Sequence, residues 1–219
     1  MRDHANNDAR PGTAWPNPTQ SDFDEFLLRL YFGQIGDYLR LCVDRAYLDF
    51  NRTLHGMAKE KRREAIRAAG ASILLKSLRS LANGSVGNQG VFDSWHRRTC
   101  EQLRKAFRKS GYSRFTVGHA QKWLNMSLKY TFAMGEKRLP GFGRFFKFAH
   151  IPVDRVMMHE LGIEGAPGLD VPWSKLDSYD AYMNVQTWIR RKFEGSAPMA
   201  VEFRLWLDSS MHGNPAAKH

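Results

Sequence analysis

A lysine and an aspartate, Lys122 and Asp154, are the residues of this chain whose types and setting point to chemistry. Lys122 lies in a segment with helical periodicity, and Asp154 follows the tripeptide IPV at the start of a second, shorter helical pattern. An unprotonated amine is a nucleophile, and a carboxylate stabilises positive charge that develops on a reacting carbon. Two packed helices that bring these side chains together would therefore form a nucleophile and a charge stabiliser.

Both residues also have ordinary structural explanations. Aspartate is favoured at a helix N-cap for its hydrogen bonds alone, and a lysine on a basic helix often contacts a phosphate or water. A lysine ammonium is not nucleophilic, so Lys122 has to be desolvated or placed beside another cation before it can react. The N-terminus of its helix, with Arg155 or Lys122 nearby, would keep Asp154 ionised.

A strongly basic region surrounds this pair. Between Trp95 and His150 there are thirteen Lys and Arg residues and two acidic residues, an excess equal to the formal net charge of +11. Aromatic residues are interleaved with the basic ones, and such a surface can hold phosphates and stack on bases. The sequence therefore predicts a nucleic acid as the partner. The residues expected to contact it are Arg114, Thr116, Gly118, His119, Lys129, Arg144, Lys147 and Arg155.

Apolar residues recur at helical spacing along most of the chain, and no stretch alternates convincingly like a strand, so we expect an all-α protein. The chain has 219 residues, 42% of them hydrophobic, which is enough for a sizeable core. The glycine- and asparagine-rich segment 83–90 is the clearest break and the expected junction of two lobes. We predict flexible tails at 1–20 and 209–219 and a single bilobed helical domain at 21–208, with the hairpin and catalytic region at 111–163.

Composition and spacing disfavour several classes of protein. Cys42 and Cys100 are too few for a disulfide framework or a four-thiolate cluster. The chain has no run of 18 apolar residues and no apolar run at its N-terminus, so we expect a cytoplasmic monomer without a membrane partner. His119 and His150 lack metal-ligand spacing, and we expect no metal and no cofactor. The segment NRTLHG, at 51–56, places its Arg and His too close together for a ribonuclease site.

Two segments have the glycines that let backbone N–H groups approach a phosphate. The first is LPGFG, at 139–143, but only eleven residues, Arg144 to Asp154, follow it. That is too few for a helix of normal length and a loop before the aspartate. We therefore predict that the earlier segment YSRFTVGH, with Gly118 at the entry to the lysine helix, is the phosphate-binding hairpin. LPGFGRFF is then an insertion beside the site.

The segments HAQKWLNMSLKY and HIPVDRVMMHELGI resemble the helix-hairpin-helix DNA glycosylase superfamily. Within this superfamily they are most similar to the archaeal 8-oxoguanine DNA glycosylase type. In this superfamily a PVD segment carries the catalytic aspartate, and in that branch a lysine precedes it at a spacing similar to the 32 residues between Lys122 and Asp154. The resemblance covers residues 111–207. It departs from the usual glycine-lysine adjacency, because GHAQK separates Gly118 from Lys122. If Lys122 is displaced by a turn, Lys129 or no lysine is the catalytic amine.

The resemblance implies a two-lobed helix-hairpin-helix fold and a DNA glycosylase that flips a base out of duplex DNA and excises it, leaving an abasic site. Attack by Lys122 would add AP lyase activity, whereas attack by water would not. The base is either an oxidised purine, in DNA repair, or a hypermodified cytosine such as glucosylated hydroxymethylcytosine in phage DNA, in antiviral defence. The alternative is a non-catalytic helix-hairpin-helix DNA-binding protein. Candidates for the base-pocket wall are Trp123, Phe142, His150 and Trp173.

Overall fold

The computed structural model shows a helical protein. The regular elements of its described part are eight α-helices and four short 3-10 helices, with no strand. This confirms the prediction of an all-α protein. Within the same part of the chain, no helix is long and apolar enough to cross a membrane. The structure describes residues 16–33, 36–84 and 86–211, apart from the side chains of Ala58, Ser210 and Met211, so most of the two predicted tails lies outside it.

The chain divides into two compact units, Met1–Ile35 and Gly36–His219. The first contains α1 (Gln20–Phe32), whose residues are all partly or fully exposed. A capping box starts this helix: the hydroxyl oxygen of Thr19 accepts a hydrogen bond from the Asp22 N–H, and the Asp22 carboxylate accepts one from the Thr19 N–H at 2.7 Å. The N-cap is therefore Thr19, whereas the sequence SDFD, at 21–24, predicts Ser21 as the N-cap.

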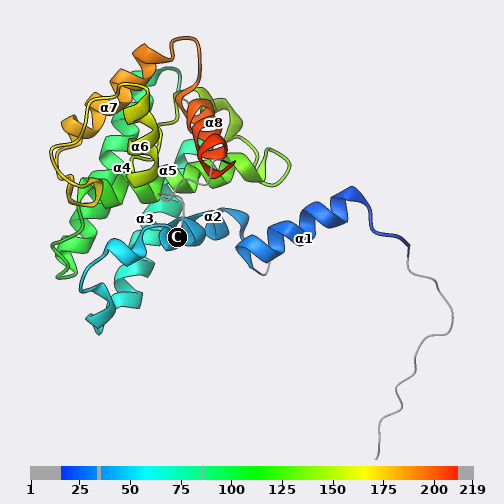
Figure 1. Ribbon diagram of the computed structural model, residues 1–219. Helices are drawn as coiled ribbons and strands as arrows, with labels where there is room; N and C mark the ends of the chain where they lie inside the picture. The colour runs from blue at the N-terminus through cyan, green and yellow to red at the C-terminus, as the bar shows by residue number, and fades with distance from the viewer. Residues whose placement is uncertain (1–15, 34–35, 85, 212–219) are drawn as a thin grey trace, which may run out of the picture. The chain divides into compact units, whose positions relative to one another are not determined.

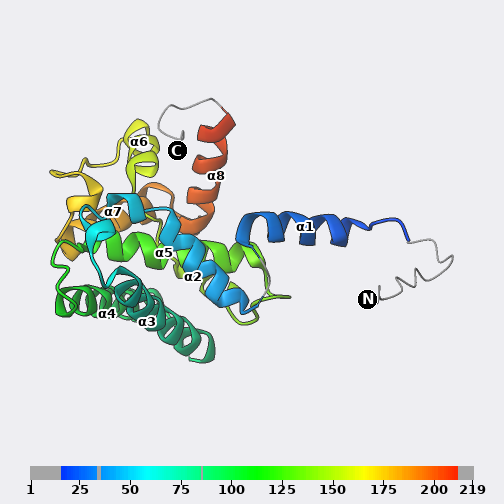
Figure 2. The same ribbon diagram turned by 90° about the horizontal axis from the view of Figure 1, so that it is seen from below.

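The second unit is built around α5 (Val117–Met134). This helix packs against α2 (Tyr38–Leu48), α4 (Gln89–Lys109) and α7 (Tyr179–Lys192), and α3 (Arg63–Asn83) packs on α2 and α4 (Figure 1). The other elements are α6 (Arg155–Ile163), α8 (Pro198–Met211), η1 (Asn51–Thr53), η2 (Met57–Lys59), η3 (Gly143–Phe148) and η4 (Trp173–Lys175). Figure 2 shows α3 and α4 on one side of α5, and α6 and α8 on the other.

The segment 83–90, predicted as a lobe junction, connects α3 to α4, and these two helices pack against each other. Asn88 is the N-cap of α4, where its side-chain oxygen accepts a hydrogen bond from the Val91 N–H at 3.0 Å. The break in the sequence pattern thus falls between two consecutive helices that pack against each other.

Helix α5 is buried along almost its whole length, from Val117 to Thr131 and again at Met134. Its largest apolar side chain, Trp123, is fully buried and donates its indole N–H to the Val43 carbonyl at 2.9 Å. A helix buried on all sides also has to find a partner for every polar side chain, because an unpaired polar group in the interior is costly. The buried polar residues of α5 are His119, Gln121, Lys122, Asn125, Ser127, Lys129 and Thr131.

The N-terminal turn of α5 lies directly against η4. The Gly118 N–H donates to the Leu176 carbonyl at 2.8 Å, and a Cβ atom at position 118 would lie 1.8 Å from the Trp173 carbonyl oxygen. No side chain can make so close a contact, so only glycine lets the two backbones meet. This contact fixes residues 173–176 on the central helix.

Replacing Gly118 with alanine is expected to lower the free energy of unfolding by about 1–3 kcal/mol, because the added methyl group pushes η4 away from α5. Urea denaturation measures the change. Gly162→Ala is the matched control, because Gly162 also lies in a helix and a Cβ there meets nothing within 4 Å. That control should be neutral or more stable by up to about 1 kcal/mol. A Gly118→Ala protein as stable as the wild type would contradict the close contact.

Candidate active site

Lys122 and Asp154 are in direct contact. The Lys122 ammonium donates a hydrogen bond to Asp154 Oδ2 and forms an ion pair with it, which joins α5 to the N-terminus of α6. The Lys122 side chain is 7% exposed and that of Asp154 is 21% exposed. The pair is therefore mostly removed from water but accessible from one edge.

The ion pair opens onto a pocket of about 300 Å³. Its walls come from the end of α2 with η1, from α5, from the start of α6, and from η4. This volume is at the lower end of the range for small-molecule sites, roughly 300–1,000 Å³. The lining residues are Asp49, Arg52, Thr53, Lys122, Asp154, Arg155, Val156 and Trp173.

Asp154 combines a structural role with a charged one. As the N-cap of α6, it accepts a hydrogen bond from the Met157 N–H at 2.8 Å. Burial raises the pKa of Asp154, but the Lys122 ammonium and the hydrogen bonds from Lys122 and Met157 outweigh burial and hold the pKa below its ordinary value. The carboxylate is therefore ionised at neutral pH, at the edge of the pocket.

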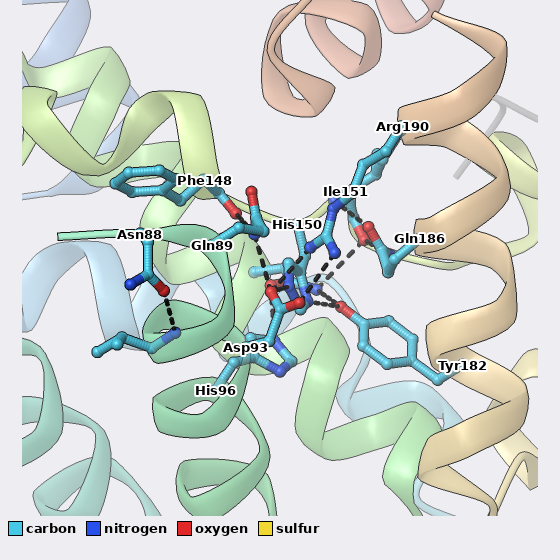
Figure 3. A network of polar contacts seen from close by, with 12 residues as sticks. Asn88, Gln89, Asp93, His96, Phe148, His150, Ile151, Tyr182, Gln186 and Arg190 are labelled. Atoms are coloured by element: carbon cyan, nitrogen blue, oxygen red, sulfur yellow. Dashed lines mark hydrogen bonds and ion pairs between the residues drawn. The ribbon is translucent and has the colours of Figure 1, made fainter. Parts of the chain in front are cut away.

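Two glutamines hold the extended chain that leads to Asp154. The Gln121 side-chain amide donates to the Val153 carbonyl at 2.6 Å and accepts from the Val153 N–H at 3.0 Å. Gln186 pairs in the same way with Ile151, at 2.9 and 3.1 Å (Figure 3). These amides satisfy backbone groups that would otherwise be buried without partners. Because Gln121 precedes Lys122 and Val153 precedes Asp154, the first pairing also brings the side chains of Lys122 and Asp154 together.

His150 supports this segment from a fully buried position. Its Nε2 lies 2.7 Å from Asp93 Oδ1 and its Nδ1 lies 2.8 Å from the Tyr182 hydroxyl (Figure 3). Arg190 holds the same Asp93 carboxylate through two N–H groups, at 2.8 and 2.9 Å. Burial lowers the pKa of His150, although Asp93 opposes this change, so the ring is neutral at pH 7. His150 does not line the pocket of Lys122 and Asp154, in contrast to its predicted place in a base-pocket wall.

Asp49 brings a second carboxyl into the pocket, and the sequence interpretation missed it. It follows α2, and its Oδ2 accepts a hydrogen bond from the Tyr130 hydroxyl at 2.8 Å. Burial raises the pKa of Asp49, and the Tyr130 hydrogen bond and the Lys122 ammonium offset burial only in part. Arg52 and Thr53 on η1 were missed as well. The only sequence signal was NRTLHG, whose internal spacing gives no site.

Lys129, a predicted DNA contact and the alternative amine, lies outside the pocket. Its Nζ is 2.7 Å from Glu202 Oε1 on α8, with side-chain exposures of 9% and 2%. The rings of Phe203 and Trp206 lie 4.9 Å from the same ammonium. Burial raises the pKa of Glu202, and Lys129 offsets part of that increase. Lys122 is thus the lysine that meets Asp154.

The predicted phosphate-binding hairpin uses its polar groups within the protein. The Thr116 hydroxyl donates to the Ser174 carbonyl at 2.9 Å, and Nδ1 of His119 accepts from the Thr116 N–H at 3.1 Å. The Gly118 N–H is bonded to Leu176. A phosphate could reach this amide only if η4 moved away from α5.

The remaining predicted cationic contacts are exposed, and Arg155 is the one that lines the pocket. Arg144 donates to carbonyl oxygens at the C-terminal end of α3. Lys147 lies 4.9 Å from the ring of the neighbouring phenylalanine, and Arg114 donates to the His55 carbonyl at 3.4 Å. Of these four cations, Arg155 alone lines the pocket, and Arg144 and Lys147 both lie on η3.

Of the aromatic candidates, Trp173 is the one that lines the pocket. Trp123 belongs to the core. Phe142 lines a separate cavity of about 650 Å³ beside the C-terminal turns of α5, together with Phe132 and Phe146. The predicted base-pocket residues are thus distributed over the core and two cavities.

No protein-family model matches the chain, and neither the curated proteins nor the solved structures gave a match. Among residues 16–33, 36–84 and 86–211, no group of three or more His, Cys, Asp and Glu could hold a metal ion.

The stability of the α5 N-terminus should depend on pH through His119. Burial lowers the pKa of His119 from its ordinary 6.5 to about 4. The unfolded chain therefore takes up this proton first, and the free energy of unfolding falls as the pH decreases from 6.5 to 4, by up to about 1.4 kcal/mol per pH unit.

His119→Gln removes this proton uptake. The difference in unfolding free energy between wild type and variant, measured with urea at pH 7 and pH 4.5, should therefore be smaller at the lower pH. A difference that does not change with pH would contradict a buried neutral His119.

Proposed function

We propose that the protein is a DNA glycosylase that excises a damaged or modified base from DNA. The observation that carries the proposal is the ion pair of Lys122 and Asp154 at the edge of a pocket, a lysine and a carboxylate brought together by two helices. The resemblance of the same two segments to helix-hairpin-helix DNA glycosylases supports DNA as the substrate. The formal net charge of +11 is also suited to a polyanion.

The pocket has the groups needed to receive a nucleotide. Arg52 and Arg155 are exposed residues of its wall, where cations can hold the phosphates on either side of a flipped nucleotide. Trp173 offers an aromatic face on which a base can stack. Flipping costs a few kcal/mol, and these contacts offset it.

Chemistry then follows from the two charged groups. Cleavage of the bond between the sugar C1′ and the base leaves positive charge on the sugar, and the ionised Asp154 stabilises it. The nucleophile is the Lys122 amine, after loss of its proton, or a water molecule. Attack by the amine gives a Schiff base and a nicked strand, whereas attack by water leaves an abasic site.

The substrate belongs to one of two classes, an oxidised purine or a hypermodified cytosine of phage DNA. A pocket of about 300 Å³ has room for a base. A base that carries a hexose would project that sugar through the open side of the pocket.

A substrate panel tests the proposal. Plain, oxidised and phage-modified DNA are incubated with the protein and heated in alkali, which breaks the strand at abasic sites. We expect breaks in one of the two modified DNAs. DNA that is bound but never broken would overturn the glycosylase proposal and favour the non-catalytic DNA-binding protein.

Asp154→Asn is expected to slow excision by about 10²–10³-fold, because it removes the charge that stabilises the sugar cation. Asparagine is an equally good N-cap, so α6 should keep its start. Single-turnover rates are compared with those of Asp170→Asn, an exposed carboxylate outside the pocket. Thermal melting and DNA affinity check that the variant is folded. Excision at the wild-type rate would remove Asp154 from the mechanism.

Borohydride trapping tests the lysine. If the Lys122 amine attacks the sugar, wild-type protein gives a covalent adduct with its substrate DNA, and Lys122→Ala gives none. Lys105→Ala, which changes an exposed lysine of α4, should give the wild-type amount. An undiminished adduct in Lys122→Ala would place the nucleophile elsewhere, and breaks without any adduct would identify water as the nucleophile.

A further inference from the structure

Two carboxyl groups line the same pocket, and they come from different parts of the fold. Asp154 is held by α5 and α6, where it pairs with Lys122 and caps a helix. Asp49 comes from the end of α2 and is held by the Tyr130 hydroxyl at 2.8 Å. Cleavage of a glycosidic bond by two carboxyl groups is a common arrangement in enzymes, with one group charged and the other protonated.

Such a mechanism needs one carboxyl group that stays charged and one that stays protonated. The surroundings of the two groups favour the charged form of Asp154 and the protonated form of Asp49. An ammonium in direct contact favours the charged form of Asp154, and its pKa is lowered. Asp49 receives a neutral hydroxyl hydrogen bond in place of an ammonium, and burial raises its pKa. Carboxyl groups whose environments separate their pKa values can act as an acid and a charge stabiliser in one site.

We propose that Asp49 is the catalytic acid that donates a proton to the departing base. This assignment rests on the proposed glycosylase activity. Tyr130 orients the carboxyl by binding one oxygen, which leaves the other oxygen to carry the proton. Tyr130 is thus a positioning residue, and Asp49 lies in the wall that the base would contact.

Each proton of the reaction has a source and a destination. The C1′–N bond breaks, its electron pair leaves with the base, and the Asp49 proton is transferred to the base. A new bond forms between C1′ and the nucleophile, which is water or the Lys122 amine. The amine is formed only when the Lys122 ammonium of the ion pair has first released one proton to solvent. The nucleophile then loses a proton, which returns to Asp49 and restores the acid. One proton has moved from the nucleophile to the base.

Cations around Asp49 favour proton donation to the base, because they stabilise the carboxylate that donation leaves. Arg45 lies on the preceding helix, and Lys122 and Lys129 act on Asp49 from α5. Arg52, Asp154 and Arg155 are further charged residues that line the same pocket as Asp49.

The test compares the wild type with Asp49→Asn, Asp49→Glu and Asp44→Asn. Asparagine can still accept the Tyr130 hydrogen bond but has no proton to give, whereas glutamate keeps an acid. Asp44→Asn is the matched control, because Asp44 lies on the helix that precedes Asp49, outside the pocket, and pairs with Arg40 and Arg67. Single-turnover excision of the base identified by the substrate panel is measured from pH 5 to pH 9. Affinity for a duplex with a tetrahydrofuran abasic-site analogue is measured in parallel.

We expect Asp49→Asn to slow excision by about 10²–10⁴-fold. Its affinity for the analogue duplex should stay within about threefold of the wild-type value. The wild-type rate should fall as the pH rises above the pKa of the acid, and this fall should be absent in Asp49→Asn. Asp49→Glu should recover part of the rate together with the pH dependence, and Asp44→Asn should match the wild type.

Three results would overturn the proposal. Excision by Asp49→Asn at the wild-type rate would show that no proton from this residue is needed. Equal losses of excision and of affinity for the analogue would assign Asp49 to the fold instead. A wild-type protein that excises no base from any DNA of the panel would overturn the proposed function itself, and the role of Asp49 with it.

Discussion

Two ammonium groups buried on one helix are the constraint on which the second unit depends. Removing an ammonium from water costs several kcal/mol unless a carboxylate lies against it, and breaking such a pair costs about 3–5 kcal/mol. Lys122 meets Asp154 at the start of α6, and Lys129 meets Glu202 on α8. Because the two lysines lie seven residues apart, they project from the same side of α5. An ion pair therefore joins each of α6 and α8 to the central helix, and the pair of Lys122 and Asp154 lines the pocket.

The neutral polar groups of α5 and α7 complete that arrangement. Gln121 and Gln186 bind an extended segment as a neighbouring strand would, although the described part of the chain has no strand. Each glutamine amide has a fixed position along its helix, so it can pair with only one residue of the extended segment. The two pairings therefore fix how the segment is aligned along the helices. The position of Asp154 therefore follows from backbone hydrogen bonds that are themselves buried, and not from the ion pair alone.

Helical periodicity was enough to predict the all-α class, because apolar spacing reflects the burial of each helix. Residue type, spacing and resemblance also selected Lys122 and Asp154, which lie in contact. Asp49 could not be found in this way, because it reaches the pocket only through the packing of α2 on α5. Local sequence also could not show that the predicted phosphate-binding hairpin is covered, because the segment that binds the Gly118 N–H lies more than 50 residues further along the chain. Local patterns report local geometry, and contacts between distant segments decide which groups remain open.

The contact between Gly118 and the Trp173 carbonyl divides the pocket wall into a rigid and an adaptable part. The backbone of residues 173–176 is shared with the start of α5, so its path cannot drift during evolution without disturbing the central helix. The Trp173 indole, which projects from the same backbone, is partly buried against the apolar cluster that contains Val117 and Ile151, and the preceding loop between Glu164 and Val171 is partly exposed, with Ala166 and Leu169 packed on the same cluster. A change of the Trp173 side chain or of the length of that loop would therefore alter the pocket wall, while the backbone that holds Lys122 and Asp154 keeps its path.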